Sequence, residues 1–149
     1  MLNRGLFVKI IVILIFISIG YSIFNIKEFD LEFLVDKSKS TISVENIRLN
    51  GKVTRLPLNI YYINGKLKIG DQEYILTEYK KEDSPRDLKV DAYKIYFVDN
   101  NNSNNFYGYA RVTGNILNDS VKSMYISVIT TKKNIGSTHE ENINAYIKK

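Results

Sequence analysis

The side chains best suited to binding in this sequence are three tyrosines and one arginine. Tyr107, Tyr109 and Arg111 alternate along one predicted strand, and Tyr125 lies on the next. Residues two apart in a strand share a face, and cross-strand neighbours share it too. A tyrosine ring offers a stacking surface with a polar hydroxyl, and a guanidinium forks to a carboxylate or phosphate. We predict that these four residues bind a protein, peptide or envelope partner. The alternative is that the rings only stabilise the sheet, or form a second core face of a sandwich.

Residues that commonly serve in catalysis do not form a set in this chain. The sequence has no cysteine, which excludes a thiolate nucleophile, a disulfide and a cysteine metal site. His139 is the only histidine, and its neighbours in the sequence do not supply an acid–base or metal partner. Residues 99–107 match only the first half of a calcium loop, since Asn104 and Ala110 replace the glycine and glutamate it needs. We expect a non-catalytic protein with no cofactor and no metal.

An apolar segment at the N-terminus decides where the other residues are located. Residues 6–24 read LFVKIIVILIFISIGYSIF, with Lys9 as the single charge. A helix of about 20 apolar residues crosses roughly 30 Å of hydrocarbon, and a lysine near its end can return its ammonium to the headgroups. We predict a transmembrane helix within residues 1–25 and an exported β-rich domain over residues 26–149. The anchoring side chains are Leu6, Ile10, Ile13, Leu14, Phe16, Ile17 and Phe24.

The charges on either side of this segment predict its orientation. Arg4 and Lys9 lie at its start, whereas acidic residues dominate after Lys27, so the N-terminus is expected in the cytoplasm and the domain outside. A cleaved signal peptide is the alternative, because Ser18 and Gly20 provide small residues, and the protein would then be secreted. The apolar run continues past Gly20 without an A-x-A site, which favours the uncleaved anchor. A composition rich in isoleucine, lysine and asparagine suggests a bacterial source.

The exported part is patterned as an antiparallel β-meander, closed as a barrel or folded as a sandwich. The Asn64-Gly65 pair indicates a hairpin turn. Residues 106–116 alternate regularly, and their core face includes glycines such as Gly108 that let a backbone or an aromatic ring approach closely. A capping box before Glu141 predicts a short C-terminal helix over residues 138–148, although alternation there also allows a last strand.

The composition favours binding over other functions. The net charge of +5 is spread among acidic residues, so no basic stripe indicates nucleic-acid binding. Eleven tyrosines are many for 149 residues, and they support a surface that binds other molecules. We therefore expect a membrane-anchored, extracytoplasmic binding or accessory module at the outer face of a bacterial cytoplasmic membrane. The alternative is a carrier of small apolar ligands, in which the meander closes as a lipocalin-like barrel.

Overall fold

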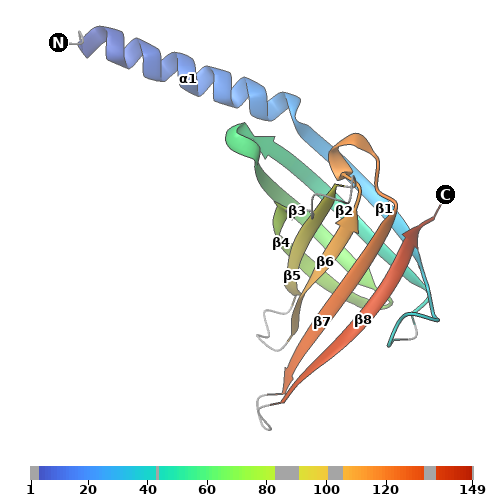
Figure 1. Ribbon diagram of the computed structural model, residues 1–149. Helices are drawn as coiled ribbons and strands as arrows, with labels where there is room; N and C mark the ends of the chain where they lie inside the picture. Colours follow the sequence, from blue (N-terminus) through green and yellow to red (C-terminus); the bar gives the residue numbers. More distant parts are fainter. Residues whose placement is uncertain (1–3, 43, 83–90, 101–105, 133–136, 149) are drawn as a thin grey trace.

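The structure is a computed structural model that describes residues 4–42, 44–82, 91–100, 106–132 and 137–148. Within these residues, one α-helix precedes eight β-strands and two short 3₁₀ helices (Figure 1). The elements are α1 (Arg4–Phe24), β1 (Ile26–Val35), β2 (Asn46–Leu56), η1 (Pro57–Asn59), β3 (Ile60–Ile69), β4 (Gln72–Lys81), β5 (Ala92–Asp99), β6 (Phe106–Thr113), η2 (Ile116–Asn118), β7 (Ser123–Lys132) and β8 (Ser137–Ile147).

The strands form a closed antiparallel barrel in which each strand pairs with its neighbours in the sequence. The ring closes where β1 pairs with β8, through Phe33 with Ile147 and Val35 with Ala145. Closure gives every strand two partners and removes the unpaired edges of an open sheet. The mainly β prediction is confirmed, and of the two predicted architectures the structure is the barrel.

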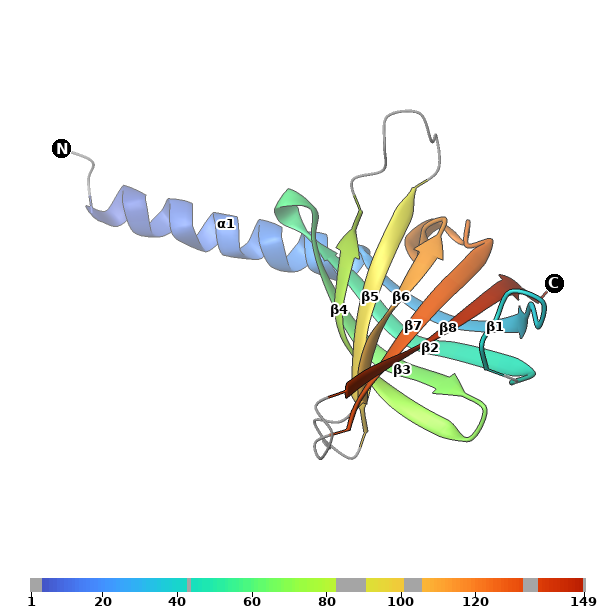
Figure 2. The ribbon, with the colours of Figure 1, turned by 60° about the horizontal axis from the view of Figure 1, so that its bottom comes forward.

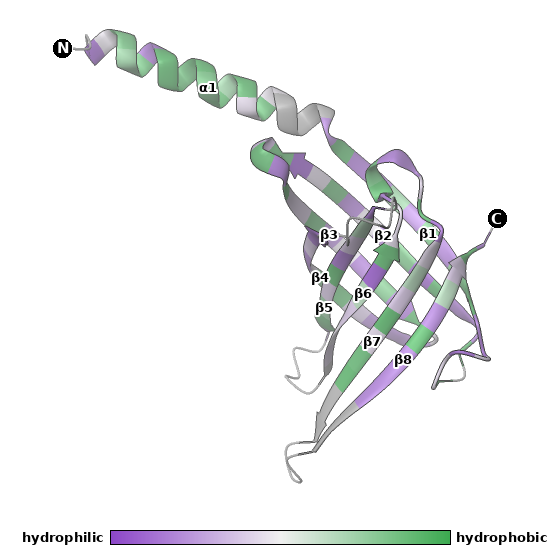
Figure 3. Cartoon of the chain, viewed as in Figure 1, coloured by the Kyte–Doolittle hydropathy of each residue, from purple (hydrophilic) through white to green (hydrophobic). Residues whose placement is uncertain are grey.

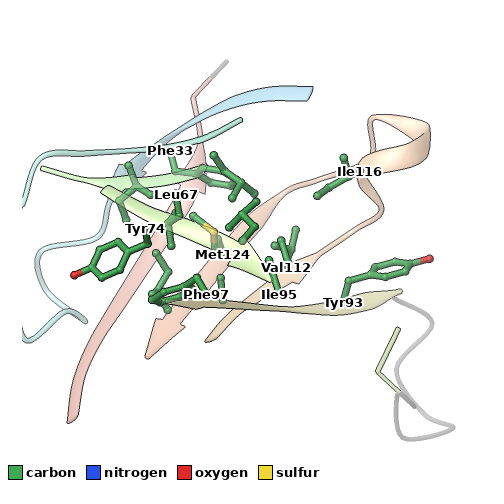
Figure 4. Close-up of a cluster of buried hydrophobic side chains, with 14 of the residues drawn as sticks. Phe33, Leu67, Tyr74, Tyr93, Ile95, Phe97, Val112, Ile116 and Met124 are labelled. Carbon is green, nitrogen blue, oxygen red and sulfur yellow. The ribbon is translucent and has the colours of Figure 1, made fainter. Parts of the chain in front are cut away.

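Large side chains from every strand fill the interior of the barrel. They come from alternate positions, as the period of two in a half-buried strand requires. Figure 4 shows Phe33, Leu67, Phe97 and Met124 pointing into one cluster, and each of them is at most 2% exposed. A barrel of eight strands is just wide enough for side chains to fill, so this packing explains why the chain folds without disulfides.

Gly108 lets an aromatic ring from the neighbouring strand β5 enter this core. It pairs with Phe97 across the β5–β6 ladder. A Cβ atom on Gly108 would lie 2.7 Å from Phe97 Cζ and 2.2 Å from the Ser127 carbonyl oxygen. The prediction that a glycine on this face admits an aromatic ring is therefore confirmed.

The β2–β3 hairpin turns at a different place from the predicted one. Asn64-Gly65 lies inside β3, where Gly65 pairs with Gly51 of β2. The chain reverses at η1 instead, where Leu58 and Asn59 adopt positive φ angles of 65° and 58°. The glycines serve contact between strands: a Cβ on Gly65 would lie 2.2 Å from the Asn50 carbonyl oxygen. The predicted turn was wrong because the same residue type also permits two backbones to approach closely.

The predicted C-terminal helix over residues 138–148 was also wrong, because this segment forms β8. Ile143 and Ala145 are only 0% and 1% exposed, and they alternate with residues on the outer surface. The capping-box pattern is a local signal, whereas a strand here satisfies the backbone groups of both β7 and β1. The alternation noted in the sequence was the better guide.

Three tyrosines fill one end of the barrel. This is the end nearest α1, where Ile26, η1 and η2 lie, and we call it the α1 end. The Tyr79 and Tyr93 rings stack at 4.8 Å with an interplanar angle of 2°, and Tyr61 lies edge-on to both. The Tyr93 hydroxyl accepts a hydrogen bond of 2.8 Å from the Asn115 side-chain amide. The buried Tyr79 hydroxyl lies near the Ile116 backbone but forms no hydrogen bond of good geometry with the described residues. Burial raises the pKa of both tyrosines, which stay neutral.

Helix α1 extends away from the barrel (Figures 1 and 2). Its contacts with the barrel are mainly with β2 and η1. Every residue from 4 to 19 is exposed, although most of them are hydrophobic (green in Figure 3). Among the residues that the structure describes, no helix combines the length and the apolar character needed to cross a membrane.

Candidate functional site

The predicted binding residues lie on the outer wall of the barrel, over β5 to β8. Because Ala110 and Val112 of β6 point inward, Tyr109 and Arg111 point outward. The β6–β7 register places Arg111 opposite Tyr125. Tyr125 therefore lies on the same face as Tyr109 and Arg111, as the sequence predicted.

A lysine from β5 completes an aromatic and cationic cluster on this wall. The Lys94 Nζ atom lies 3.9 Å from the centre of the Tyr109 ring and 5.5 Å from that of Tyr96. The Tyr109 and Tyr125 ring centres are 6.3 Å apart, with their planes tilted by 49°. An ammonium over an aromatic face gains about 0.5–1 kcal/mol at an exposed site, so Lys94 holds the Tyr109 ring in place.

Polar contacts orient the remaining side chains. The Arg111 Nε atom lies 2.5 Å from an oxygen of Glu82, directly after β4. The Tyr125 hydroxyl donates a hydrogen bond of 2.5 Å to the Asn142 side-chain oxygen. Burial, with smaller effects of Tyr109 and Glu140, raises the pKa of Tyr125. The hydroxyl therefore stays protonated at neutral pH.

These side chains surround a surface hollow of about 460 Å³, which we call the wall hollow. It combines aromatic faces, an ammonium, a guanidinium that already has a carboxylate partner, and a side-chain amide. Such a surface can stack against a planar or apolar group and hydrogen-bond to its polar edge. Its described lining residues include no serine, threonine or cysteine that could act as a nucleophile beside a base. The lining residues are Glu82, Lys94, Tyr109, Arg111, Tyr125 and Asn144.

The structure brings three of the four predicted binding residues together and leaves one apart. Tyr109, Arg111 and Tyr125 line the wall hollow, whereas Tyr107 does not. Tyr107 lies on the same face of β6, is 45% exposed, and pairs with Val98 and Ile129.

Sequence reasoning missed Lys94, Glu82 and Asn144 as lining residues. Lys94 stands at an outward position of β5, but its place opposite Arg111 depends on the β5–β6 register. Asn144 belongs to the segment that was predicted to be a helix. Reading residues 137–147 as a strand would have placed Asn144 on the outer face, but its position opposite Tyr125 depends on the β7–β8 register.

The structure places most of the predicted anchor residues on the exposed helix. Leu6, Ile10, Ile13, Leu14, Phe16 and Ile17 are between 42% and 70% exposed. Phe24 ends α1, and its side chain lies outside the described residues.

The other candidate sites gain no geometry from the structure. His139 falls in β8, but its side chain is outside the described part. The calcium-loop candidate includes residues 101–105, which are also outside it. Among the described residues, no three His, Cys, Asp or Glu side chains gather as a metal site would require.

The fold and the site define an eight-stranded antiparallel barrel with an exposed apolar N-terminal helix and an aromatic and cationic hollow on its wall. Compared with known proteins, the chain matches no family model, no curated protein and no solved structure.

Proposed function

We propose that this protein is a non-catalytic binding or accessory module, anchored through α1 at the outer face of a bacterial cytoplasmic membrane. The N-terminus lies in the cytoplasm and the barrel lies outside. The observation that carries this proposal is the exposure of α1, because residues 4–19 are exposed on all sides although most are apolar.

A helix that is apolar all round is stable where apolar surroundings cover it, in a protein core or in a bilayer. The barrel leaves most of α1 uncovered. Phe16 and Ile17, for example, are 70% and 61% exposed. Transfer of each such side chain from water to hydrocarbon is favourable by about 1.5–3 kcal/mol. No helix among the described residues meets the requirements of a span by itself, and the proposal therefore rests on the full apolar run of residues 6–24, in which Lys9 is the single charge. A bilayer supplies apolar surroundings for that run, and the positive charges of Arg4 and Lys9 favour the cytoplasmic side for its start.

The wall hollow supports the binding part of the proposal. It presents half-buried aromatic rings and the exposed Arg111, held by fixed contacts such as Lys94 over Tyr109. A pre-organised surface loses less conformational entropy on binding. Tethering to a membrane raises the effective concentration for a protein, peptide or envelope partner there, so modest affinity suffices.

The filled interior favours this proposal over the carrier of small apolar ligands. Phe33, Phe97 and Met124 meet in the middle of the barrel (Figure 4), where a carrier holds its ligand. We expect an apolar fluorescent dye to show no stoichiometric binding to the purified protein. One dye bound per chain would favour the carrier instead.

The anchor is tested with C-terminally tagged protein in cells. Membranes are washed with alkaline carbonate, external protease is added to intact cells, and the intact mass is measured. Full-length protein in the washed membrane, with a tag digested from outside, supports the proposal. A chain that begins near Tyr21 or Ile23 and appears in the medium overturns the anchor, and a protected tag overturns the orientation.

A pair of variants isolates the contribution of α1. A charge at the centre of a membrane helix costs about 2.5–3.5 kcal/mol, so Leu14→Glu is expected to shift protein from the washed membrane into the soluble fraction. Leu34→Glu makes the same change at a barrel residue that is 48% exposed, and it should leave the distribution unchanged. Equal behaviour of the two variants contradicts the anchoring role of α1.

The wall hollow is tested by photo-crosslinking in intact membranes. A photoreactive phenylalanine replaces Tyr125 inside the hollow, or Tyr107 on the same face outside it. A crosslinked product from position 125 that disappears with Lys94→Ala, and is absent from position 107, supports the hollow as the binding surface. Equal crosslinking from both positions contradicts it.

A further inference from the structure

Among the described residues of the barrel, the hairpin tip between β2 and β3 carries the most exposed large apolar side chain. Leu58 is 91% exposed, Ile60 54% and Tyr62 63%. On the neighbouring strand, Ile26 is 48% exposed and lies in one row with Tyr62, because both pair with Thr54 of β2. We call Ile26, Leu58, Ile60 and Tyr62 the apolar tip.

The backbone holds Leu58 in this exposed position. Leu58 has φ 65° and ψ 24°, the left-handed conformation that glycine or asparagine adopts more easily. For a residue with a Cβ atom this conformation is strained. The Arg55 Nη2 atom donates a hydrogen bond of 2.5 Å to the Asn59 side-chain oxygen, and Pro57 fixes the first residue of the turn. The turn therefore presents a large apolar side chain to the surroundings from a constrained backbone.

The tip lies beside α1. Helix α1 contacts both η1 and β2, and the hairpin tip appears next to the helix at the point where the helix joins the barrel (Figures 1 and 3). A bilayer that surrounds α1 would have its outer interface near this junction. The apolar tip would then meet the same interface.

The outward residues of β3 follow the polarity profile of such an interface. From the tip downward they are Ile60, Tyr62, Asn64, Lys66 and Lys68. Apolar side chains come first, an amphipathic tyrosine follows, and amide and charged groups come last. Tyrosine is enriched at the boundary between membrane and water, and a lysine keeps its charged ammonium beyond it, in the headgroup region or the solvent.

We propose that the apolar tip is a second membrane contact, in which Leu58 and Ile60 enter the outer interface of the bilayer beside α1. This inference rests on the proposed anchoring by α1. Together, the helix and the tip make two points of contact and fix how the barrel stands on the membrane. A second copy of the chain or a protein partner on the tip would be the competing occupant.

The chain lacks tryptophan, so one introduced tryptophan reports its own surroundings without background. Full-length Leu58→Trp and Ile60→Trp are reconstituted into phosphatidylcholine–phosphatidylglycerol vesicles, with or without brominated acyl chains. Phe16→Trp reports on α1, and Leu34→Trp, at an exposed residue near the opposite end of β1, is the matched control. Far-UV circular dichroism confirms that each variant is folded.

We expect blue-shifted emission and quenching by brominated lipid at positions 58, 60 and 16, and neither effect at position 34. Quenching at position 16 without quenching at 58 and 60 overturns the tip contact and leaves the anchor intact. Loss of quenching at position 16 overturns the proposed anchor itself. A blue shift at position 58 without bromine quenching shows that protein covers the tip, and this also overturns the inference.

Discussion

A single methyl group placed between β2 and β3 provides a sharp test of the barrel geometry. In Gly65→Ala the new Cβ atom would lie 2.2 Å from the Asn50 carbonyl oxygen and 2.8 Å from the Gly51 Cα atom. Real Cβ contacts are essentially never shorter than 3.0 Å, so the strands must separate locally by about 0.8 Å. Both atoms in the way belong to the backbone and cannot rotate aside.

The cost of this separation follows from the pairing that it disturbs. Gly65 lies near the middle of a ladder that runs from Ile47↔Ile69 to Leu56↔Ile60. Overpacking by a methyl group usually costs about 1–3 kcal/mol, and alanine recovers about 0.4–1 kcal/mol by restricting the unfolded chain. Because rigid backbone must move, we expect the upper part of this range, a net destabilisation of about 2–2.5 kcal/mol. For a domain of this size that lowers Tm by roughly 6–10 °C.

Unfolding of the full-length protein in detergent is followed by far-UV circular dichroism, with Gly70→Ala as the control. Gly70 has a φ of +57°, but a Cβ there would make only an ordinary contact of 3.5 Å with Val44. At Gly65 the situation is reversed: a Cβ atom would collide with the backbone of β2, but φ is not positive. The left-handed strain at Gly70 costs about 1–2 kcal/mol, partly offset by the same restriction of the unfolded chain. A smaller loss of stability in Gly65→Ala than in Gly70→Ala refutes the close-approach argument.

Two further predictions concern hydroxyl and carboxylate groups. Tyr93→Phe should lower the free energy of unfolding by about 1 kcal/mol, because it leaves the Asn115 amide without its partner. Tyr79→Phe should be close to neutral, since its buried hydroxyl forms no hydrogen bond of good geometry with the described residues. Equal losses of the two variants in urea unfolding would contradict this. The bidentate hydrogen bonds from Arg48 hold the pKa of Asp30 below its ordinary 3.8. This ion pair stabilises the fold above pH 3.8, and the stabilisation is lost as the pH falls through the lowered pKa of Asp30. The Tm difference between wild type and Arg48→Gln should therefore disappear in acid. A Tm difference that does not change with pH would exclude an ionic origin.

Patterns within one strand were readable from the sequence, whereas contacts that depend on register were not. The alternation around Ala110 identified the inner and outer faces of β6 correctly, because side-chain direction in a strand is a local property. Lys94 was missed as a lining residue because its place depends on how β5 and β6 align.

The two predictions that were wrong share a physical cause. Asn64-Gly65 indicated a turn, and the capping box indicated a C-terminal helix, but both are local signals. The glycine is needed for contact with Gly51, and residues 137–147 are needed to close the ring between β7 and β1. Such needs arise only when strands from distant parts of the chain meet.

The order of strands around the barrel would allow the proposed membrane contact and the proposed partner binding at the same time. The apolar tip joins β2 to β3, whereas the wall hollow centres on β6 and β7, four strands further around a closed ring of eight. The two surfaces therefore lie on opposite sides of the barrel. Arg111 and Tyr125 are each two residues from the strand ends at Thr113 and Ser123, which belong to the α1 end. With α1 and the tip on the bilayer, the hollow would stay uncovered and close to the membrane surface, where a membrane-bound partner could reach it.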